Sequence, residues 1–305
     1  MSVVGFDTSN YTTSIAYFTG VDGVNCSQLL PVKPGELGLR QSDAVFHHTK
    51  SLPELSGRLF SRVQGDIEAV GVSTRPRAVE GSYMPCFMVG YSHAKMLSDA
   101  YRVPLFEVSH QQGHVAASLW SAGRLDLMDK PHLAWHLSGG TTEFLLVEPE
   151  GKNVKCSRIG GTTDISAGQL IDRTGVMLGL PFPAGKHLDA LSGEAQGREV
   201  FKVKCPEMEF SLSGVQNKVQ QFHKGDNAET AAYALRCVAF AVRKATENAL
   251  KAYPGLEVVF SGGVASNSML RQLTADLHPI YCAPQYSTDN AMGVAVLTKR
   301  LMEGI

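Results

Sequence analysis

Two histidines lie four residues apart in the segment VPLFEVSHQQGHVAASLW, residues 103–120. Ser109 followed three residues later by Gln112 is the pattern of a capping box, which predicts that a helix begins at His110. His110 and His114 then lie one turn apart on the same helix face, a spacing at which two imidazoles can bind one metal ion. In the alternative interpretation, one histidine caps or packs and the other is solvated.

The residues around the two histidines limit the chemistry that a metal could do there. In zinc proteases with this spacing, a glutamate directly after the first histidine is the general base. Gln111 occupies that position and cannot act as a base, so a metalloprotease is poorly supported. A third ligand could come from Asp289 in YSTDNAMG, although an aspartate at a predicted helix start is usually only a cap.

Three turns of small residues are candidate phosphate sites: DTSN at 7–10, LSGGTT at 137–142 and FSGGVASN at 260–267. Glycine turns and helix starts expose backbone N–H groups that can point at an anion. Together the three turns indicate a nucleotide site.

A further candidate is the segment 161–180, which is predicted to be a helix. Asp164, Gly168 and Asp172 would share one face, and the glycine would leave room for a ligand beside the two carboxylates, which could receive ribose hydroxyls. In the alternative interpretation, this is a solvated acidic face with glycines for helix packing.

Composition bounds the class of protein. The chain has 305 residues, of which 44% are hydrophobic and 19% charged, with a formal net charge of -1. Any nucleic-acid contact must therefore use a local basic patch. No apolar run is long enough to span a bilayer, and the start MSVVGFDTSN lacks the cationic region of a signal peptide, so no membrane association is expected. Six scattered cysteines without a CxxC pair favour reduced thiols in the cytoplasm.

The elements that must position these residues alternate between strand and helix, which predicts an α/β fold. Strands are predicted at 67–73 and 256–263, and helices at 82–101, 161–180 and 229–252. The last of these is the clearest amphipathic helix, with apolar residues at 231, 234, 235, 238, 242, 245 and 249.

Two predicted hairpins are alike: VVGFDTSNYTTSIAYF near the start and LAWHLSGGTTEFLLVE near the middle. Each has a β-rich run, a turn of small polar residues and a second β-rich run. The likeness indicates a duplicated two-lobe protein with a ligand in the cleft. A chance resemblance between two hairpins is the alternative.

Together these segments resemble one family along nearly the whole chain: the large subunit of the tRNA N6-threonylcarbamoyladenosine synthase, long labelled O-sialoglycoprotein endopeptidase or glycoprotease. The matching blocks are SHQQGH, LSGGTTEF, DISAGQLIDRTGVMLGLPFPAG, FSLSGVQNKV, FSGGVASNSMLR and STDNAMG. The resemblance implies the two-lobed actin-like ATPase fold of actin, sugar kinases and Hsp70, with duplicated lobes. It implies an N-terminal lobe at 1–125, with a helix at 290–305 packing back on it, and a C-terminal lobe at 126–289.

The resemblance also implies a site. His110, His114 and Asp289 match the family's three protein ligands for one divalent metal, iron or zinc. ATP or an adenylate would bind beside the metal. Positions that match the nucleotide or substrate site are Ser138, Gly139, Gly140, Thr141, Asp172, Gly185, Asp189, Gly262, Gly263 and Asn267. The implied reaction is transfer of threonylcarbamoyl from threonylcarbamoyl-AMP to N6 of adenosine 37 of tRNA, and no side chain is identified as the catalytic group.

Several positions depart from the family pattern. Asn10, Tyr11 and Thr12 replace a cysteine and two acids, Arg75 and Arg77 of Arg75-Pro76-Arg77 replace glycines, Thr141 replaces a histidine, Ile165 an acid and Gln216 a lysine. Arginine does not readily adopt positive φ, so the loop at 75–77 is expected to differ in shape or to bind something different.

Retained ligands within a substituted site predict a divergent bacterial paralogue. One hypothesis is an enzyme that carries out the family reaction on tRNA or on an altered acceptor. The other is a non-catalytic scaffold that keeps the fold and the metal and pairs with a related protein. Expected partners are tRNA, a smaller homologous subunit and an ATPase partner, as in bacterial members, or a second copy in a homodimer.

Overall fold

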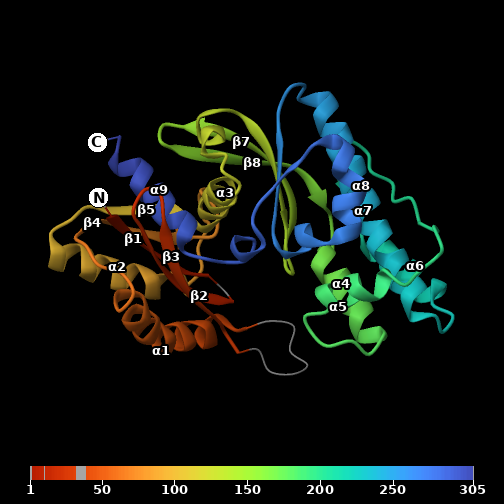
Figure 1. Cartoon of the computed structure of the whole chain (residues 1–305), viewed down its shortest axis with the longest axis horizontal. Coiled ribbons are helices and arrows are strands. Elements are labelled where there is room, and N and C mark those ends of the chain that lie inside the picture. Colours follow the sequence, from red (N-terminus) through yellow and green to blue (C-terminus); the bar gives the residue numbers. More distant parts are fainter. Residues whose placement is uncertain (1, 10, 32–38, 305) are drawn as a thin grey trace. The chain divides into compact units, whose positions relative to one another are not determined.

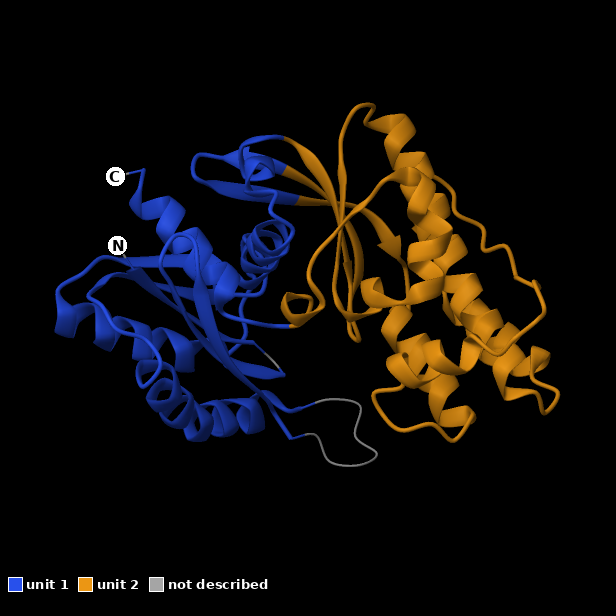
Figure 2. Cartoon of the chain, viewed as in Figure 1, with its two compact units in different colours: residues 1–130, 148–156, 289–305 blue, residues 131–147, 157–288 orange. Residues whose placement is uncertain are grey.

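The computed structural model describes residues 2–9, 11–31 and 39–304, which form two compact units (Figures 1 and 2). Unit 1 consists of residues 1–130, 148–156 and 289–305, and unit 2 of residues 131–147 and 157–288. Each unit has a β-sheet with helices packed against it, so the predicted α/β class is confirmed. The predicted lobe boundaries stay predictions.

Unit 1 contains a five-stranded sheet in the order β3-β2-β1-β4-β5. Its strands are β1 (Ser2–Thr8), β2 (Thr12–Phe18), β3 (Gly23–Leu29), β4 (Ile67–Arg75) and β5 (Leu105–Ser109). The first three pair antiparallel, whereas β1, β4 and β5 run parallel to one another. The carboxyl ends of these three parallel strands therefore meet at one edge of the sheet.

Helices α1 (Gln41–Phe60) and α2 (Phe87–Tyr101) pack on one face of this sheet, and α3 (His110–Ser121) and α9 (Met292–Met302) on the other (Figure 1). Unit 1 also contains the 3-10 helix η1 (Leu125–Asp129). Val4 and Phe6 pack in one buried cluster with Leu52 of α1. Gly5 between them faces the other way, and a Cβ there would lie 2.6 Å from the Ala295 nitrogen, so the glycine lets α9 pack directly on β1.

Unit 2 contains a six-stranded sheet in the order β11-β10-β6-β7-β8-β9. Its strands are β6 (His132–Leu137), β7 (Thr142–Glu150), β8 (Asn153–Thr162), β9 (Glu209–Phe210), β10 (Val258–Ser261) and β11 (Ile280–Tyr281); the tip of the β7–β8 hairpin belongs to unit 1. Its helices are α4 (Ala167–Met177), α5 (Gly185–Ser192), α6 (Ser213–Phe222), α7 (Asn227–Ala252) and α8 (Ser268–Thr274), with 3-10 helices η2 (Gly263–Ser266), η3 (Ala275–Leu277) and η4 (Pro284–Tyr286).

The long helix α7 provides much of the core of unit 2. All seven of its predicted apolar positions are buried, which confirms the amphipathic pattern between 229 and 252. They pack in one cluster with residues of β6, β7, β10 and the helices α4, α5 and α6. The apolar period of about 3.6 residues thus places these seven positions on one face that is buried along the helix, and in its first half the residues 230–235 are buried on all sides.

Two predicted helices begin later than expected. The segment 161–180 was predicted as one helix, but β8 runs to Thr162 and α4 begins at Ala167. Ser166 and Gln169 form a capping box there, which satisfies the first backbone N–H groups of α4 and fixes its start. The predicted helix 82–101 begins at Phe87, because Met84 precedes Pro85 and a residue before proline disfavours the helical conformation.

Candidate metal centre and glycine turns

The start of α3 lies at the sheet edge where β1, β4 and β5 end. Ser109 accepts the Gln112 N–H at 3.2 Å, and the Gln112 side chain accepts the Ser109 N–H at 2.9 Å, so the predicted capping box is confirmed. The Gln112 amide also donates to the Val154 carbonyl at 2.7 Å. These contacts hold the first turn of α3, and therefore His110, in one position.

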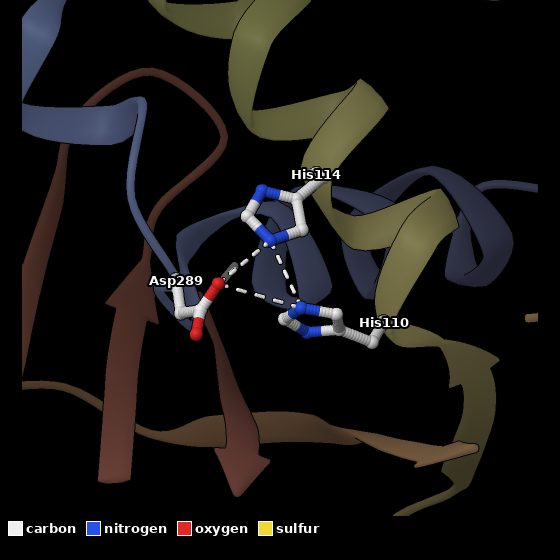
Figure 3. A group of neighbouring side chains, drawn as sticks. All are labelled: His110, His114 and Asp289. Atoms are coloured by element: carbon white, nitrogen blue, oxygen red, sulfur yellow. Dashed lines mark hydrogen bonds and ion pairs between the residues drawn. The ribbon is translucent and has the colours of Figure 1, made fainter. Parts of the chain in front are cut away.

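His110, His114 and Asp289 lie together in unit 1 (Figure 3). The two histidine Nε2 atoms are 2.9 Å apart, and Asp289 Oδ1 lies 3.1 Å from His114 Nε2 and 3.5 Å from His110 Nε2. Ligand atoms that share one ion at about 2.1 Å lie roughly 3.0–3.4 Å apart. The spacing of these three atoms therefore fits one metal ion.

Asp289 is not a helix cap. The helix that follows it, α9, begins only at Met292, and the Met292 N–H donates to the side chain of Asn290, not to that of Asp289. The Asp289 carboxylate instead accepts the Ser9 hydroxyl at 3.1 Å and faces the two histidines. The alternative interpretation, in which Asp289 caps the helix after it, is therefore wrong.

Asp7, at the end of β1, belongs to the same cluster, whereas its sequence context, DTSN at 7–10, predicted a phosphate turn and no part in the metal site. His110 Nδ1 lies 3.0 and 3.1 Å from its two carboxylate oxygens, and the Ser73 hydroxyl at the end of β4 donates to it. Asp7 is 1% exposed. An acid in a strand that is otherwise buried was the available signal, since a buried carboxylate needs partners.

The two carboxylates and two imidazoles perturb one another. Burial lowers the pKa of His110, but the Asp7 carboxylate and the hydrogen bonds with Asp289 and Asp7 outweigh it and raise this pKa to about 10. Burial raises the pKa of Asp289, yet hydrogen bonds from His110 and His114 hold it well below its usual range. Two carboxylates beside two neutral imidazoles carry a charge of -2, which one divalent cation would neutralise.

The SGG turn of unit 2, Ser138–Thr141, joins β6 to β7. The Ser138 N–H donates to the Thr141 carbonyl at 2.8 Å, and the Ser138 hydroxyl accepts the Thr141 N–H at 3.0 Å. A Cβ built on Gly139 or Gly140 would meet no atom of the described chain within 4 Å. The turn is thus closed by its own residues and open on the side of its glycines, as an anion-binding turn requires.

Gly168, near the start of α4, packs against this turn. A Cβ on Gly168 would overlap the Gly139 backbone, and Ser166 donates to the Gly139 carbonyl at 2.6 Å. The predicted room for a ligand at Gly168 is therefore wrong, because backbone fills it. Asp164 precedes α4 and instead accepts Ser211 and Ser213 hydroxyls at the start of α6, so it does not share a helix face with Asp172.

Asp172, Asp189 and Asn267 hold neighbouring helix starts in unit 2. Asp172 accepts the Ala184 N–H at 2.8 Å just before α5 begins at Gly185, and burial raises the pKa of Asp172. Asp189 accepts the Asn267 amide at 2.8 Å, and Asn267 accepts the Leu270 N–H at 3.0 Å as the cap of α8. Asp189 and Asn267 are therefore brought together.

The second glycine turn, Gly262–Gly263, follows β10. Gly262 has φ +90° and lies against the Leu137 carbonyl, so only glycine fits. A Cβ on Gly263 would meet no atom of the described chain within 4 Å. Gly262 thus lets β10 approach the end of β6, while Gly263 stays open.

The departures from the family pattern lie in varied surroundings. Tyr11 is 39% exposed, Thr12 is buried in β2, and Asn10 lies outside the described residues. Neither Arg75 nor Arg77 has positive φ, so the loop adopts a backbone conformation that arginine tolerates. The Pro76 carbonyl accepts the Gln111 N–H at 3.0 Å, so the loop contacts the first turn of α3.

Two other departures lie in unit 2. Ile165 packs against the core of this unit, so an apolar side chain is accommodated where the family pattern has an acid. Gln216 accepts a hydrogen bond from Arg173 at 2.8 Å. A lysine at 216 could not accept this bond, so Gln216 and Arg173 form a contact suited to the residues present.

In the part of the chain that the structure describes, none of the helices has the length and apolar character needed to cross a bilayer.

A family model for tRNA N6-adenosine threonylcarbamoyltransferase, TsaD, matches residues 36–296. Among curated proteins bearing that name, one from Streptococcus suis is 33% identical over 246 residues, covering 76% of this chain and 70% of the relative. One from Archaeoglobus fulgidus is 29% identical over 276 residues, covering 90% and 81%.

Solved structures resemble the chain at low identity. HypF of T. kodakarensis has a TM-score of 0.65 at 13% identity, covering 99% of this chain and 48% of HypF, so the chain spans about half its length. Component A of the Acidaminococcus fermentans (R)-2-hydroxyglutaryl-CoA dehydratase has a TM-score of 0.58 at 16% identity, and a ROK hexokinase from Thermus thermophilus 0.53 at 15%; each alignment covers 99% of both chains. These likenesses show the fold alone and confirm the predicted actin-like ATPase fold.

Proposed function

Because the chain belongs to the tRNA N6-adenosine threonylcarbamoyltransferase family, we propose that it transfers threonylcarbamoyl from threonylcarbamoyl-AMP to N6 of adenosine 37 of tRNA, or carries out a diverged version of this reaction. The adenosine nitrogen bonds to the carbamoyl carbon, the bond from that carbon to the phosphate oxygen breaks, AMP leaves and the amine loses a proton. Membership of the family supports a transferase that acts on tRNA.

We propose that His110, His114 and Asp289 hold one divalent metal ion, iron or zinc. The convergence of His110 Nε2, His114 Nε2 and one Asp289 oxygen is the observation that carries this proposal. The metal, when bound, would act as a Lewis acid on carbamoyl or phosphate oxygens.

We propose that the glycine turns of unit 2 bind the phosphate of ATP or of the adenylate. The support is the open space at Gly139, Gly140 and Gly263, where backbone can approach an anion closely. Ser138 and Thr141 close the first turn by hydrogen bonds, and Gly262 positions the second turn by allowing β10 to lie close to the end of β6. Backbone N–H groups directed at the phosphate would stabilise the negative charge that develops as AMP leaves. Asp172, Gly185, Asp189 and Asn267 would frame the rest of the nucleotide site.

The remaining assignments are also proposals. The lobes would be residues 1–125 with the helix at 290–305, and residues 126–289. Partners would be tRNA, a smaller homologous subunit and an ATPase, or a second copy of this chain. The cytoplasm is the proposed compartment, which the six free cysteines favour.

The test is transfer of threonylcarbamoyl to unmodified tRNA, with threonylcarbamoyl-AMP supplied, with and without the proposed protein partners, and an active relative run alongside. We expect modified adenosine with the wild type and none with His110→Ala/His114→Ala, which should also purify without metal. The variant His47→Ala/His93→Ala removes two other imidazoles from helices of unit 1 and should keep both properties.

Two outcomes would contradict the proposals separately. Undiminished metal in His110→Ala/His114→Ala would refute the ligand assignment. No product from folded, metal-loaded wild type in the presence of the partner proteins, while the relative is active, would refute the family reaction and favour an altered acceptor or the scaffold role. The scaffold role is favoured by Thr141, Ile165 and Gln216, which replace a histidine, an acid and a lysine of the family pattern.

A further inference from the structure

We infer that Asp7, held by Ser73, is a positioning residue: it fixes His110 in the one tautomer that directs a lone pair from Nε2 toward Asp289 and His114. This inference rests on the proposed metal site. It adds two residues outside the proposed ligand set that decide whether His110 can be a ligand.

The Asp7 carboxylate contacts the His110 ring at Nδ1. Nδ1 of His110 lies 3.0 and 3.1 Å from the two oxygens of the Asp7 carboxylate. An ionised carboxylate can only accept hydrogen bonds, so Nδ1 must carry a proton. In a neutral imidazole the other nitrogen, Nε2, then has the lone pair.

The lone pair on Nε2 of His110 is directed toward His114 and Asp289. Nε2 of His110 lies 2.9 Å from His114 Nε2 and 3.5 Å from Asp289 Oδ1 (Figure 3). The opposite tautomer would set an Nδ1 lone pair against the Asp7 carboxylate and an N–H bond where the ligand atoms converge. Asp7 thus disfavours the tautomer that cannot bind a metal, in the manner of a carboxylate–histidine–metal triad.

Asp7 is itself held in place by burial and by Ser73. Its carboxylate is 1% exposed, and the 0% exposed Ser73 donates a hydroxyl proton to it. Both residues sit on paired strands, since β1 and β4 are parallel neighbours with Phe6 opposite Val72. Two strands of one sheet therefore hold the carboxylate in place, which is how a supporting shell keeps a ligand's geometry.

A purely structural ion pair between Asp7 and His110 is the competing explanation, and metal binding separates the two. The test uses Asp7→Asn, because its amide keeps the shape and can donate to Nδ1, which favours the wrong tautomer. Titration with Co²⁺ gives the dissociation constant and the visible absorption of the bound ion. Nitrogen NMR of ¹⁵N-histidine-labelled, Zn²⁺-loaded protein identifies the tautomer of His110.

We expect Asp7→Asn to bind Co²⁺ about 10–100-fold more weakly and with altered absorption, and His110 to shift toward the Nε2–H tautomer. Ser73→Ala should weaken binding less, because the carboxylate stays but loses one restraint. Asp43→Asn, in the first turn of α1, removes an exposed charge of the same kind and should bind as the wild type does.

The outcomes distinguish the two proposals. If the wild type binds no Co²⁺, the proposed metal site fails and this inference falls with it. If the wild type binds Co²⁺ and folded Asp7→Asn binds it equally with an unchanged tautomer, the metal site stands and the inference is overturned. Should Asp7→Asn not fold, Ser73→Ala decides instead, and wild-type affinity and tautomer in that variant overturn the inference.

Discussion

His110 lies between two carboxylates from distant parts of the sequence, Asp7 and Asp289, and they decide what charge its ring carries. Without a metal the proton is the cation available to this cluster, which is why the pKa of His110 is raised to about 10. A divalent ion would replace that proton. Metal binding near neutral pH should therefore release a proton, and affinity should increase with pH.

The metal-free protein should lose stability in alkali because of His110. Its pKa is about 10 in the folded protein against 6.5 for an ordinary histidine, so the imidazolium stabilises the fold fully below pH 6.5. This contribution, on the order of a few kcal/mol, is lost as pH rises toward 10. Urea unfolding of chelator-treated protein at several pH values between 6 and 10 measures it.

His110→Gln supplies the control for this prediction. It lacks the titrating group, so its free energy of unfolding should change less over the same pH range. Lysines and tyrosines titrate equally in both proteins and cancel in the comparison. Parallel pH profiles of wild type and His110→Gln would contradict the assigned pKa.

At the scale of elements, α4 begins where it can pack on the SGG turn. Ser166 both caps α4 and donates to the Gly139 carbonyl, and Gly168 allows the two backbones to meet. The helix start and the proposed phosphate turn are therefore one packed unit. A change in the packing of α4 should alter the turn.

Gly168→Ala should disturb this unit. Its Cβ would overlap the Gly139 backbone, so we expect a loss of roughly 1–3 kcal/mol of unfolding free energy and weaker nucleotide binding. Gly214→Ala is the matched control in α6, since a Cβ there meets nothing in the described chain within 4 Å and alanine suits a helix. Equal stability and ATP affinity in both variants would contradict the proposed contact.

Elements whose apolar residues recur with a clear helical period could be predicted from the sequence, and α7 is an example. The start of α4 was missed although Ser166 and Gln169 repeat the pattern of Ser109 and Gln112, because an apolar period alone does not locate a helix end. The sequence marks Asp7 as an acid in a buried strand, but it does not identify the partners of its carboxylate. Its role depends on β1, β4 and β5 ending at one edge, and strand pairing is a tertiary property.

At the scale of the whole molecule, unit 1 is made from segments that are far apart in the sequence. Residues 289–305 provide Asp289 and α9, and α9 packs on β1 through Gly5 and on α3 where Gly293 meets Gly113. These glycines make the contact too close for another helix face to substitute. Unit 1 should therefore depend on this segment for its fold as well as for the third proposed metal ligand.

A chain that stops after Thr288 tests this dependence. Hydrogen exchange should show loss of protection in β1 and α3, while β6 and α7 of unit 2 stay protected. The full-length variant Asp289→Asn keeps α9 and should keep protection in unit 1 while losing metal. Unchanged exchange in β1 of the shortened chain would refute the structural role of α9.

The order of the proposed metal ligands along the chain has a consequence for biosynthesis. His110 and His114 leave the ribosome long before Asp289, which is translated only after every residue of unit 2. Chains fold from the N-terminus during translation, so unit 2 can be complete while unit 1 still lacks its final segment. A nascent chain would present the two histidines together with Asp7 but without Asp289, and only a chain translated through residue 289 would contain all three proposed ligands.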